Sequence, residues 1–413
     1  PSSSSSSSSS FPSHGLLPKS EIGADTFLQT YPEYDGRNVT VAIFDTGCDP
    51  AASGMRLTST GEQRWIDILD ATGSGDVSTS TIVEGDQVNT KDDNGDYTFV
   101  SPLSGRKLII PRSKVTNPRI RFHVGVKRGW ELFPKPLVDR MKSDRRRGFD
   151  EAQRRLEQAL QKRLANWDNH NRQTVDVTTP PSASSTTAAT ATSPSNGNAN
   201  YPTTHTPKDK ADLEARLAEG KAASAKYEDA GPVFDILVWH NGTPDPSFDG
   251  DREVGWFAMI DSSCTGDFTN AKVLTHWRDC GEYGTFSGLD LMNYSINIYD
   301  HGRVLSIVTT AGSHGSHVAG IGGAFEGKDS PVNGVAPGCK MVSIKIGDAR
   351  LGSMETGLAL VRGLIEAIRL KVDIINMSYG DSSSLPNQGR ISELIRSAVF
   401  DHGIIFVSSA GNN

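Results

Sequence analysis

Three short segments of this sequence carry side chains that together could perform acyl transfer. They are Asp45-Thr46-Gly47, the run HGSHVAG that begins at His314, and Ser409-Ala410-Gly411-Asn412. A carboxylate can orient an imidazole, the imidazole can act as a general base, and a carboxamide N–H can stabilise an oxyanion. Asp45, His314 and Asn412 are therefore the candidate catalytic residues.

Each of these segments has other interpretations when it is taken alone. An Asp-Thr-Gly turn also serves aspartic peptidases, but those need a second such turn, and the segments at Asp70 and Asp261 do not match one. His314 and His317 have a spacing that metal sites use, yet no Asp or Glu accompanies them. We expect no metal site and a structural role for His317.

Apolar runs and amphipathic segments alternate around the three motifs. The β-branched run at residues 39–44 predicts a buried parallel strand that ends at Asp45. After residue 313 we expect helices at 314–325, 354–370 and 390–402, and strands at 341–346, 372–378 and 404–408. This alternation predicts an α/β fold, a parallel sheet with helices on both faces. Ligands bind such sheets outside the carboxyl ends of the strands, where the three motifs would meet.

A long insertion of mixed helix and strand, residues 76–300, is predicted to interrupt this domain. Helices are expected at 149–167 and 209–227, and strands of one small sheet at 233–239, 255–261 and 294–299. The helix at 149–167 is basic, and we expect a solvated surface face rather than a nucleic-acid or membrane element. The Ser-rich residues 1–15 and the Ser/Thr/Ala/Pro-rich residues 174–206 are expected to be disordered.

Composition excludes several classes of partner. The 413 residues contain 42 Lys and Arg against 49 Asp and Glu, a net charge of −7, so nothing draws the chain as a whole to nucleic acid or anionic membrane. No apolar run is long enough to span a bilayer. Four cysteines without a CxxC pair favour a reducing compartment over a disulfide framework. Acyl transfer by a carboxylate, an imidazole and a carboxamide requires no cofactor.

The order of the motifs resembles the subtilisin-like serine peptidases. Members of that family carry an Asp after a buried strand, then His-Gly-Thr-His-Val-Ala-Gly at a helix start, then an Ala-Gly-Asn turn, in the chain order Asp, His, Ser. Ser316 stands where the family has Thr. The resemblance implies that Asp45 orients His314, that His314 is the general base, and that Asn412 donates to the oxyanion.

Further segments are similar to the members of this family that release tripeptides from free amino termini. These segments are residues 12–19, 31–37, 72–77, 238–240, 343–348 and 354–357. The gap of 314 − 45 = 269 positions between Asp45 and His314 is similar too. This resemblance implies oligopeptide substrates with a free amino terminus, a cytoplasmic location and a very large homo-oligomer.

The resemblance also implies which residues bind the substrate. Glu355 and Asp381 match the positions that hold the substrate's ammonium group, with Asp381 where the family usually has the longer Glu. Ser378, Tyr379 and Gly380 match the edge that pairs with the backbone of the extended peptide.

The nucleophile of this family is missing from the 413 residues, which contain neither a Gly-Thr-Ser nor a Gly-x-Ser-x-Gly turn. We therefore expect an amino-terminal fragment that is inactive by itself, with residues 16–75 and 301–413 as two parts of an incomplete catalytic domain. Two alternatives remain open, a non-catalytic pseudo-peptidase or assembly module and a secreted subtilisin-like endopeptidase.

Overall fold

A computed structural model describes residues 17–84, 95–115, 120–175, 207–242, 254–328, 330–380 and 388–411. The chain divides into two compact units. The larger unit contains the residues up to 138 and those from 231 onward, and the smaller contains residues 139–230.

A five-stranded parallel sheet lies in the larger unit, with the strand order β17-β16-β1-β13-β2. Its strands are β1 (Thr40–Asp45), β2 (Trp65–Asp70), β13 (Lys340–Lys345), β16 (Ile374–Met377) and β17 (Ile405–Ser408). The first strand thus lies between two strands from the last quarter of the chain. The sequence predicted that it belongs to their sheet, but not its place in the order. The predicted parallel sheet is confirmed.

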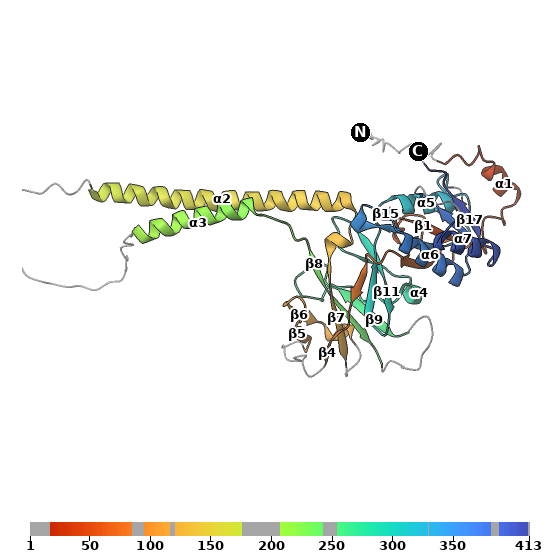
Figure 1. Ribbon diagram of the computed structural model, residues 1–413, viewed down its shortest axis with the longest axis horizontal. Helices are drawn as coiled ribbons and strands as arrows, with labels where there is room; N and C mark the ends of the chain where they lie inside the picture. The colour runs from red at the N-terminus through yellow and green to blue at the C-terminus, as the bar shows by residue number, and fades with distance from the viewer. Residues whose placement is uncertain are drawn as a thin grey trace, which may run out of the picture. The chain divides into compact units, whose positions relative to one another are not determined.

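Helices cover both faces of this sheet. Successive side chains of β1 point to opposite faces, so they pack into two different cores. Phe44 belongs to a core with Leu364 of α6 (Gly357–Arg369) and Ala398 of α7 (Arg390–Phe400). Ile43 belongs to a second core with Ala319 of α5 (His314–Gly323). Figure 1 shows α5 and α6 on either side of β1.

The helix expected at 354–370 begins later than predicted. The Thr356 hydroxyl accepts a hydrogen bond from the amide of Ala359 at 3.1 Å and so caps α6. Met354–Glu355 instead form the short strand β15, which pairs with β14 (Gly347–Asp348).

The other strands of the larger unit form separate antiparallel sheets, in the orders β10-β11-β12-β3, β4-β7-β8-β9 and β5-β6. Their bounds are β3 (Asp76–Ser78), β4 (Thr81–Glu84), β5 (Tyr97–Val100), β6 (Lys107–Ile110), β7 (Arg121–Arg128), β8 (Val233–His240), β9 (Trp256–Ile260), β10 (Gly284–Thr285), β11 (Asn293–Tyr299) and β12 (Val304–Val308). Two short helices complete the unit, α1 (Ala24–Thr30) and α4 (Trp277–Cys280).

The expectation of one small sheet from residues 233–239, 255–261 and 294–299 is wrong. β8 and β9 pair with each other, whereas β11 forms a hairpin with β12 in a different sheet. The turn of that hairpin has positive φ at Asp300, His301 and Gly302, and it fixes the pairing of β11 locally.

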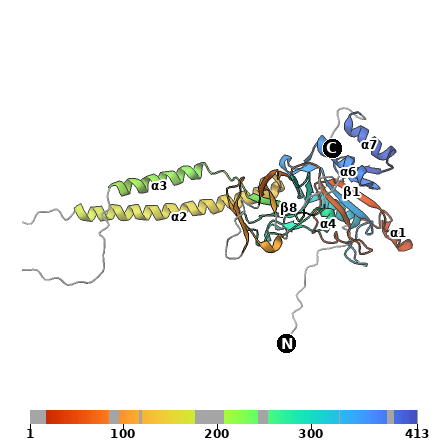
Figure 2. The same cartoon turned by 90° about the horizontal axis from the view of Figure 1, so that it is seen from below.

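The smaller unit contains α3 (Pro207–Ala225) and all but the first turn of α2 (Lys135–Val175), and the two helices lie side by side as an antiparallel pair in Figures 1 and 2. The Phe149 ring stacks on Tyr227 at 4.3 Å, and Lys210 lies 3.0 Å from Asp168. α2 is much longer than the predicted 149–167. The prediction followed the apolar face of the helix, whereas i,i+4 ion pairs such as Arg146–Asp150 stabilise helical turns without one.

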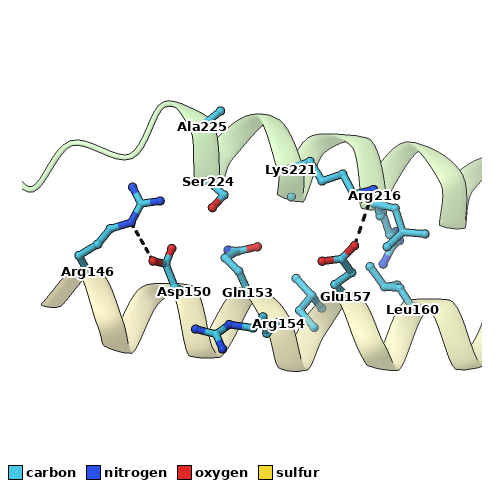
Figure 3. A pocket seen from close by; sticks show the side chains of 13 residues that line it. Arg146, Asp150, Gln153, Arg154, Glu157, Leu160, Arg216, Lys221, Ser224 and Ala225 are labelled. Carbon is cyan, nitrogen blue, oxygen red and sulfur yellow. Dashed lines mark hydrogen bonds and ion pairs between the residues drawn. The ribbon is translucent and has the colours of Figure 1, made fainter. Parts of the chain in front are cut away.

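A cavity of about 490 Å³ lies between these two helices (Figure 3). Small residues on α3, among them Gly220 and Ser224, leave it open, while Arg146 and Asp150 form part of its wall. No candidate catalytic or substrate-binding residue lines it. Among the described residues, no helix combines the length and the apolar character needed to cross a bilayer.

Candidate active site

Asp45 and His314 meet at the carboxyl end of β1, although 269 positions separate them. His314 Nδ1 lies 2.9 Å from each carboxylate oxygen of Asp45. The Asp45 side chain is fully buried, and the amide of Thr46 also donates to it at 2.7 Å. Because a carboxylate only accepts, Nδ1 carries the proton and Nε2 keeps its lone pair. The His314 side chain is 53% exposed, so that nitrogen can act on a bound reactant.

Hydrogen bonds attach the first turn of α5 to the turn that follows β1. The Thr46 hydroxyl accepts from the amide of Gly315 at 3.0 Å and donates to the carbonyl of Gly312 at 3.1 Å. The amide of Asp49 donates to the Ser316 hydroxyl at 2.9 Å. Ser316 therefore supplies the acceptor here without the methyl group of a threonine, and His314 is held from both sides.

Two glycines allow this close approach. A Cβ on Gly315 would lie 2.5 Å from the carbonyl oxygen of Gly47 and 3.1 Å from Cβ of Asp45. Gly47 itself has φ +88°, a conformation that favours glycine. The glycines of the Asp-Thr-Gly and His-Gly motifs are therefore both required where the backbone at Gly47 approaches the backbone at Gly315.

Cys48 lies beside this pair but cannot replace a serine nucleophile. Its Sγ donates to the carbonyl of Gly315 at 3.4 Å, and burial raises the pKa of its thiol to about 12, with the charge of Asp45 adding to the shift. Only the thiolate is a strong nucleophile, so this cysteine remains inert near neutral pH.

Ser378, Tyr379 and Gly380 directly follow β16, next to the imidazole. The ring of Tyr379 lies 6.3 Å from the ring of His314, centroid to centroid and nearly perpendicular. A Cβ on Gly380 would meet only Ser409 Oγ, at 3.9 Å, so the described residues leave space there. The backbone at Gly380 is therefore open to the approach of another chain on the side of its missing Cβ.

Glu355 lies on the β14–β15 hairpin, where it pairs with Gly347. Its Oε1 is buried and has no hydrogen-bond partner among the described residues. An unpaired buried acceptor costs about 1–3 kcal/mol, so this oxygen is suited to a donor that arrives with a ligand. The remaining candidates, Asp381 and Asn412, lie outside the described residues.

Sequence reasoning missed a buried ion pair beneath this edge of the sheet. Lys345, at the end of β13, lies 3.2 Å from Asp70, at the end of β2, and 2.8 Å from Ser74 Oγ. A lysine in the apolar run of residues 341–346 was the available signal, since a charge buried in a sheet needs a partner.

The model of the Subtilase family matches residues 36–413, and the chain belongs to this family of subtilisin-like serine peptidases. The predicted fold and the predicted class of enzyme are thereby confirmed.

Within that class, the chain is similar to proteins named tripeptidyl-peptidase 2. The one from Arabidopsis thaliana is 38% identical over 404 residues, which cover 96% of this chain and 26% of the relative. The one from Oryza sativa subsp. japonica is 39% identical over 406 residues, with the same two shares. A crystal structure of tripeptidyl peptidase 2 matches with a TM-score of 0.62 at 28% identity, covering 96% of this chain and 28% of that one. The chain thus spans about a quarter of the length of these relatives.

Proposed function

We propose that this chain contributes Asp45 and His314 to the active site of a peptidase that releases tripeptides from the free amino termini of oligopeptides. The observation that carries the proposal is the 2.9 Å contact between Asp45 and Nδ1 of His314, which leaves Nε2 as a base. The likeness to proteins named tripeptidyl-peptidase 2 supports the substrate class.

In this mechanism, His314 takes the proton of a serine hydroxyl as that oxygen attacks the scissile carbonyl. Asp45 stabilises the imidazolium that forms, and Asn412 donates to the oxyanion. His314 then returns the proton to the leaving amine. The 413 residues contain no Gly-Thr-Ser turn, so we propose that they are inactive without a serine supplied from elsewhere in a longer protein.

Two carboxylates would bind the amino terminus of the substrate and so set its distance from the scissile bond. Glu355 and Asp381 would hold the substrate's ammonium group, and the unpaired Oε1 of Glu355 supports the first assignment. Ser378, Tyr379 and Gly380 would pair with the peptide backbone between that anchor and the scissile bond.

The proposed setting is a large cytoplasmic homo-oligomer. The structure describes all four cysteines, and all four are thiols rather than disulfides, which fits a reducing compartment. The oligomer rests on the family resemblance.

The test uses a longer protein that contains these residues and the serine, incubated with nonapeptides whose products are identified by mass spectrometry. Wild type should release tripeptides, and His314→Ala should lower kcat by about 10⁶-fold. His317→Ala is the matched control, because His317 is exposed one turn further along α5. Full activity in His314→Ala would contradict the role of His314 as the base. The absence of any peptide cleavage by wild type would contradict the proposal as a whole and favour a pseudo-peptidase.

A further inference from the structure

The Tyr379 side chain links the candidate catalytic base to the hairpin that carries Glu355. Its hydroxyl donates to the carbonyl oxygen of Ser353 at 2.7 Å, and its ring lies against His314. Its backbone carbonyl accepts from Ser409 Oγ at 3.4 Å, in the segment that follows β17. Three parts of the site therefore meet at one residue.

The carbonyl that Tyr379 contacts is itself fixed. The Ser353 amide donates to the carbonyl of Asp348 at 2.9 Å, and its hydroxyl donates to the carbonyl of Ala311 at 2.8 Å. Ser353 adopts φ +72°, which costs a non-glycine residue energy and persists only where its surroundings enforce it. These contacts give the hydroxyl of Tyr379 a defined partner.

Gly347 leaves the space in which this contact forms. A Cβ there would lie 2.8 Å from the Tyr379 hydroxyl and 2.9 Å from the Ser353 carbonyl oxygen. Gly347 is also the residue that pairs with Glu355 across the β14–β15 hairpin. The contact of Tyr379 with Ser353 and the position of Glu355 are therefore parts of one local arrangement.

The hydroxyl stays a donor at any working pH. Burial raises the pKa of Tyr379 to about 12, and the carboxylates of Asp45 and Glu355 add to the shift. A neutral phenol keeps its proton, so the hydrogen bond to Ser353 does not depend on the ionisation of the neighbouring acids.

We propose that Tyr379 is a positioning residue that sets the distance between the amine-binding carboxylate of Glu355 and the base His314, and so selects a product of three residues. The proposal rests on the proposed function and deepens it. The ring lies 6.3 Å from the ring of His314, and the hydroxyl is hydrogen-bonded to Ser353 on the hairpin that carries Glu355, so this one side chain connects the two groups. Without that hydrogen bond, the ammonium group would be held at a less defined distance from the scissile carbonyl.

The experiment compares wild type with Tyr379→Phe, in the same longer protein and on the same nonapeptides. Tyr379→Phe keeps the ring and removes only the hydroxyl. We expect dipeptides and tetrapeptides to appear beside tripeptides, and KM to rise roughly 5- to 10-fold, the equivalent of one hydrogen bond. On peptides whose terminal amine is replaced by hydrogen, wild type and Tyr379→Phe should have equal kcat/KM, because the anchor is then unused.

Two further variants complete the design. Tyr34→Phe is the matched control, since Tyr34 is 62% exposed, and it should leave product lengths unchanged. Gly347→Ala, whose new Cβ would displace the Tyr379 hydroxyl, should give the same mixed products as Tyr379→Phe, and it serves as the test if the latter does not fold. Unchanged product lengths and KM in Tyr379→Phe, with wild type still releasing tripeptides, would overturn this proposal alone. A wild type that releases no tripeptides would instead overturn the proposed function.

Discussion

Lys345 and Asp70 form an ion pair at 3.2 Å with both side chains shielded completely from solvent. They end the adjacent strands β13 and β2, and Lys345 is also in register with Asp45 on β1. The hydroxyls of Thr72 and Ser74 donate to Asp70 at 2.5 and 2.8 Å. The pair therefore holds together the edge of the sheet at which the candidate catalytic carboxylate lies.

Removing one partner of this pair should destabilise the larger unit strongly. Asp70→Asn leaves the Lys345 ammonium buried without an opposite charge, and we expect a loss of about 3–5 kcal/mol in the free energy of unfolding. Urea unfolding followed by tryptophan fluorescence measures it. Glu84→Gln removes the exposed pair with Arg121 and should cost no more than about 1 kcal/mol. Equal losses in the two variants would contradict this account.

Acid should weaken the same pair. Burial raises the pKa of Asp70, but the charge of Lys345 and the hydroxyls of Thr72 and Ser74 outweigh it, so the pKa lies below its usual range. The stability that the ionised form provides is therefore complete above about pH 4 and is lost as the pH falls through the lowered pKa. Between pH 5 and pH 2, the free energy of unfolding should change less with pH for Asp70→Asn than for wild type.

His123 should make the free energy of unfolding depend on pH between about 5.5 and 7.5. Burial lowers the pKa of this imidazole, and the nearby Arg303 and Arg121 lower it further, although Nδ1 lies 3.1 Å from the carbonyl oxygen of Thr79. Unfolding lets the ring bind a proton more readily, so stability is complete above about pH 6.5 and falls as the pH drops toward the lowered pKa. His123→Gln should reduce the difference in unfolding free energy between pH 7.5 and pH 5.5. An unchanged difference would show that other groups cause it.

Cysteine alkylation should distinguish an exposed thiol from a buried one. Cys280 is exposed and should react with iodoacetamide in the folded protein at pH 8, whereas Cys48 is buried with a pKa of about 12 and should react only after unfolding. Tryptic peptides analysed by mass spectrometry report the two rates. Rapid labelling of Cys48 in the folded state would show that the turn beneath His314 opens readily.

Gly315→Ala should reduce activity more than it reduces stability. Its Cβ would lie 2.5 Å from the backbone oxygen of Gly47, so the helix start must move and carry His314 away from Asp45. A displacement of about 1 Å costs on the order of 10²-fold in kcat. Gly320→Ala on the same helix meets no atom within 4 Å and should keep full activity. Equal kcat values for the two variants would show that the helix start has room to adjust.

Hydrophobic periodicity predicted the strands and helices of the parallel sheet, because each of them has its own apolar pattern in the sequence. The apolar run before Asp45 and the alternation after residue 313 identified the parallel sheet and brought His314 to its edge. The pairing of β11 with β12 depends on a turn at Asp300, His301 and Gly302 that hydrophobic periodicity does not reveal. The contact of Tyr379 with Ser353 depends on a side-chain direction and on the absence of a Cβ at Gly347, and neither can be read from the spacing of residues.

The strand order also constrains how the protein is made. Among the described strands, β1 pairs with β13 and β16, so a growing chain must extend 340 − 45 = 295 residues beyond Asp45 before the first residue of a neighbouring strand is made. At about 5–20 residues per second, this strand waits on the order of 15 to 60 seconds with an apolar run and open hydrogen-bonding groups. The contact between Asp45 and His314 therefore forms late in biosynthesis.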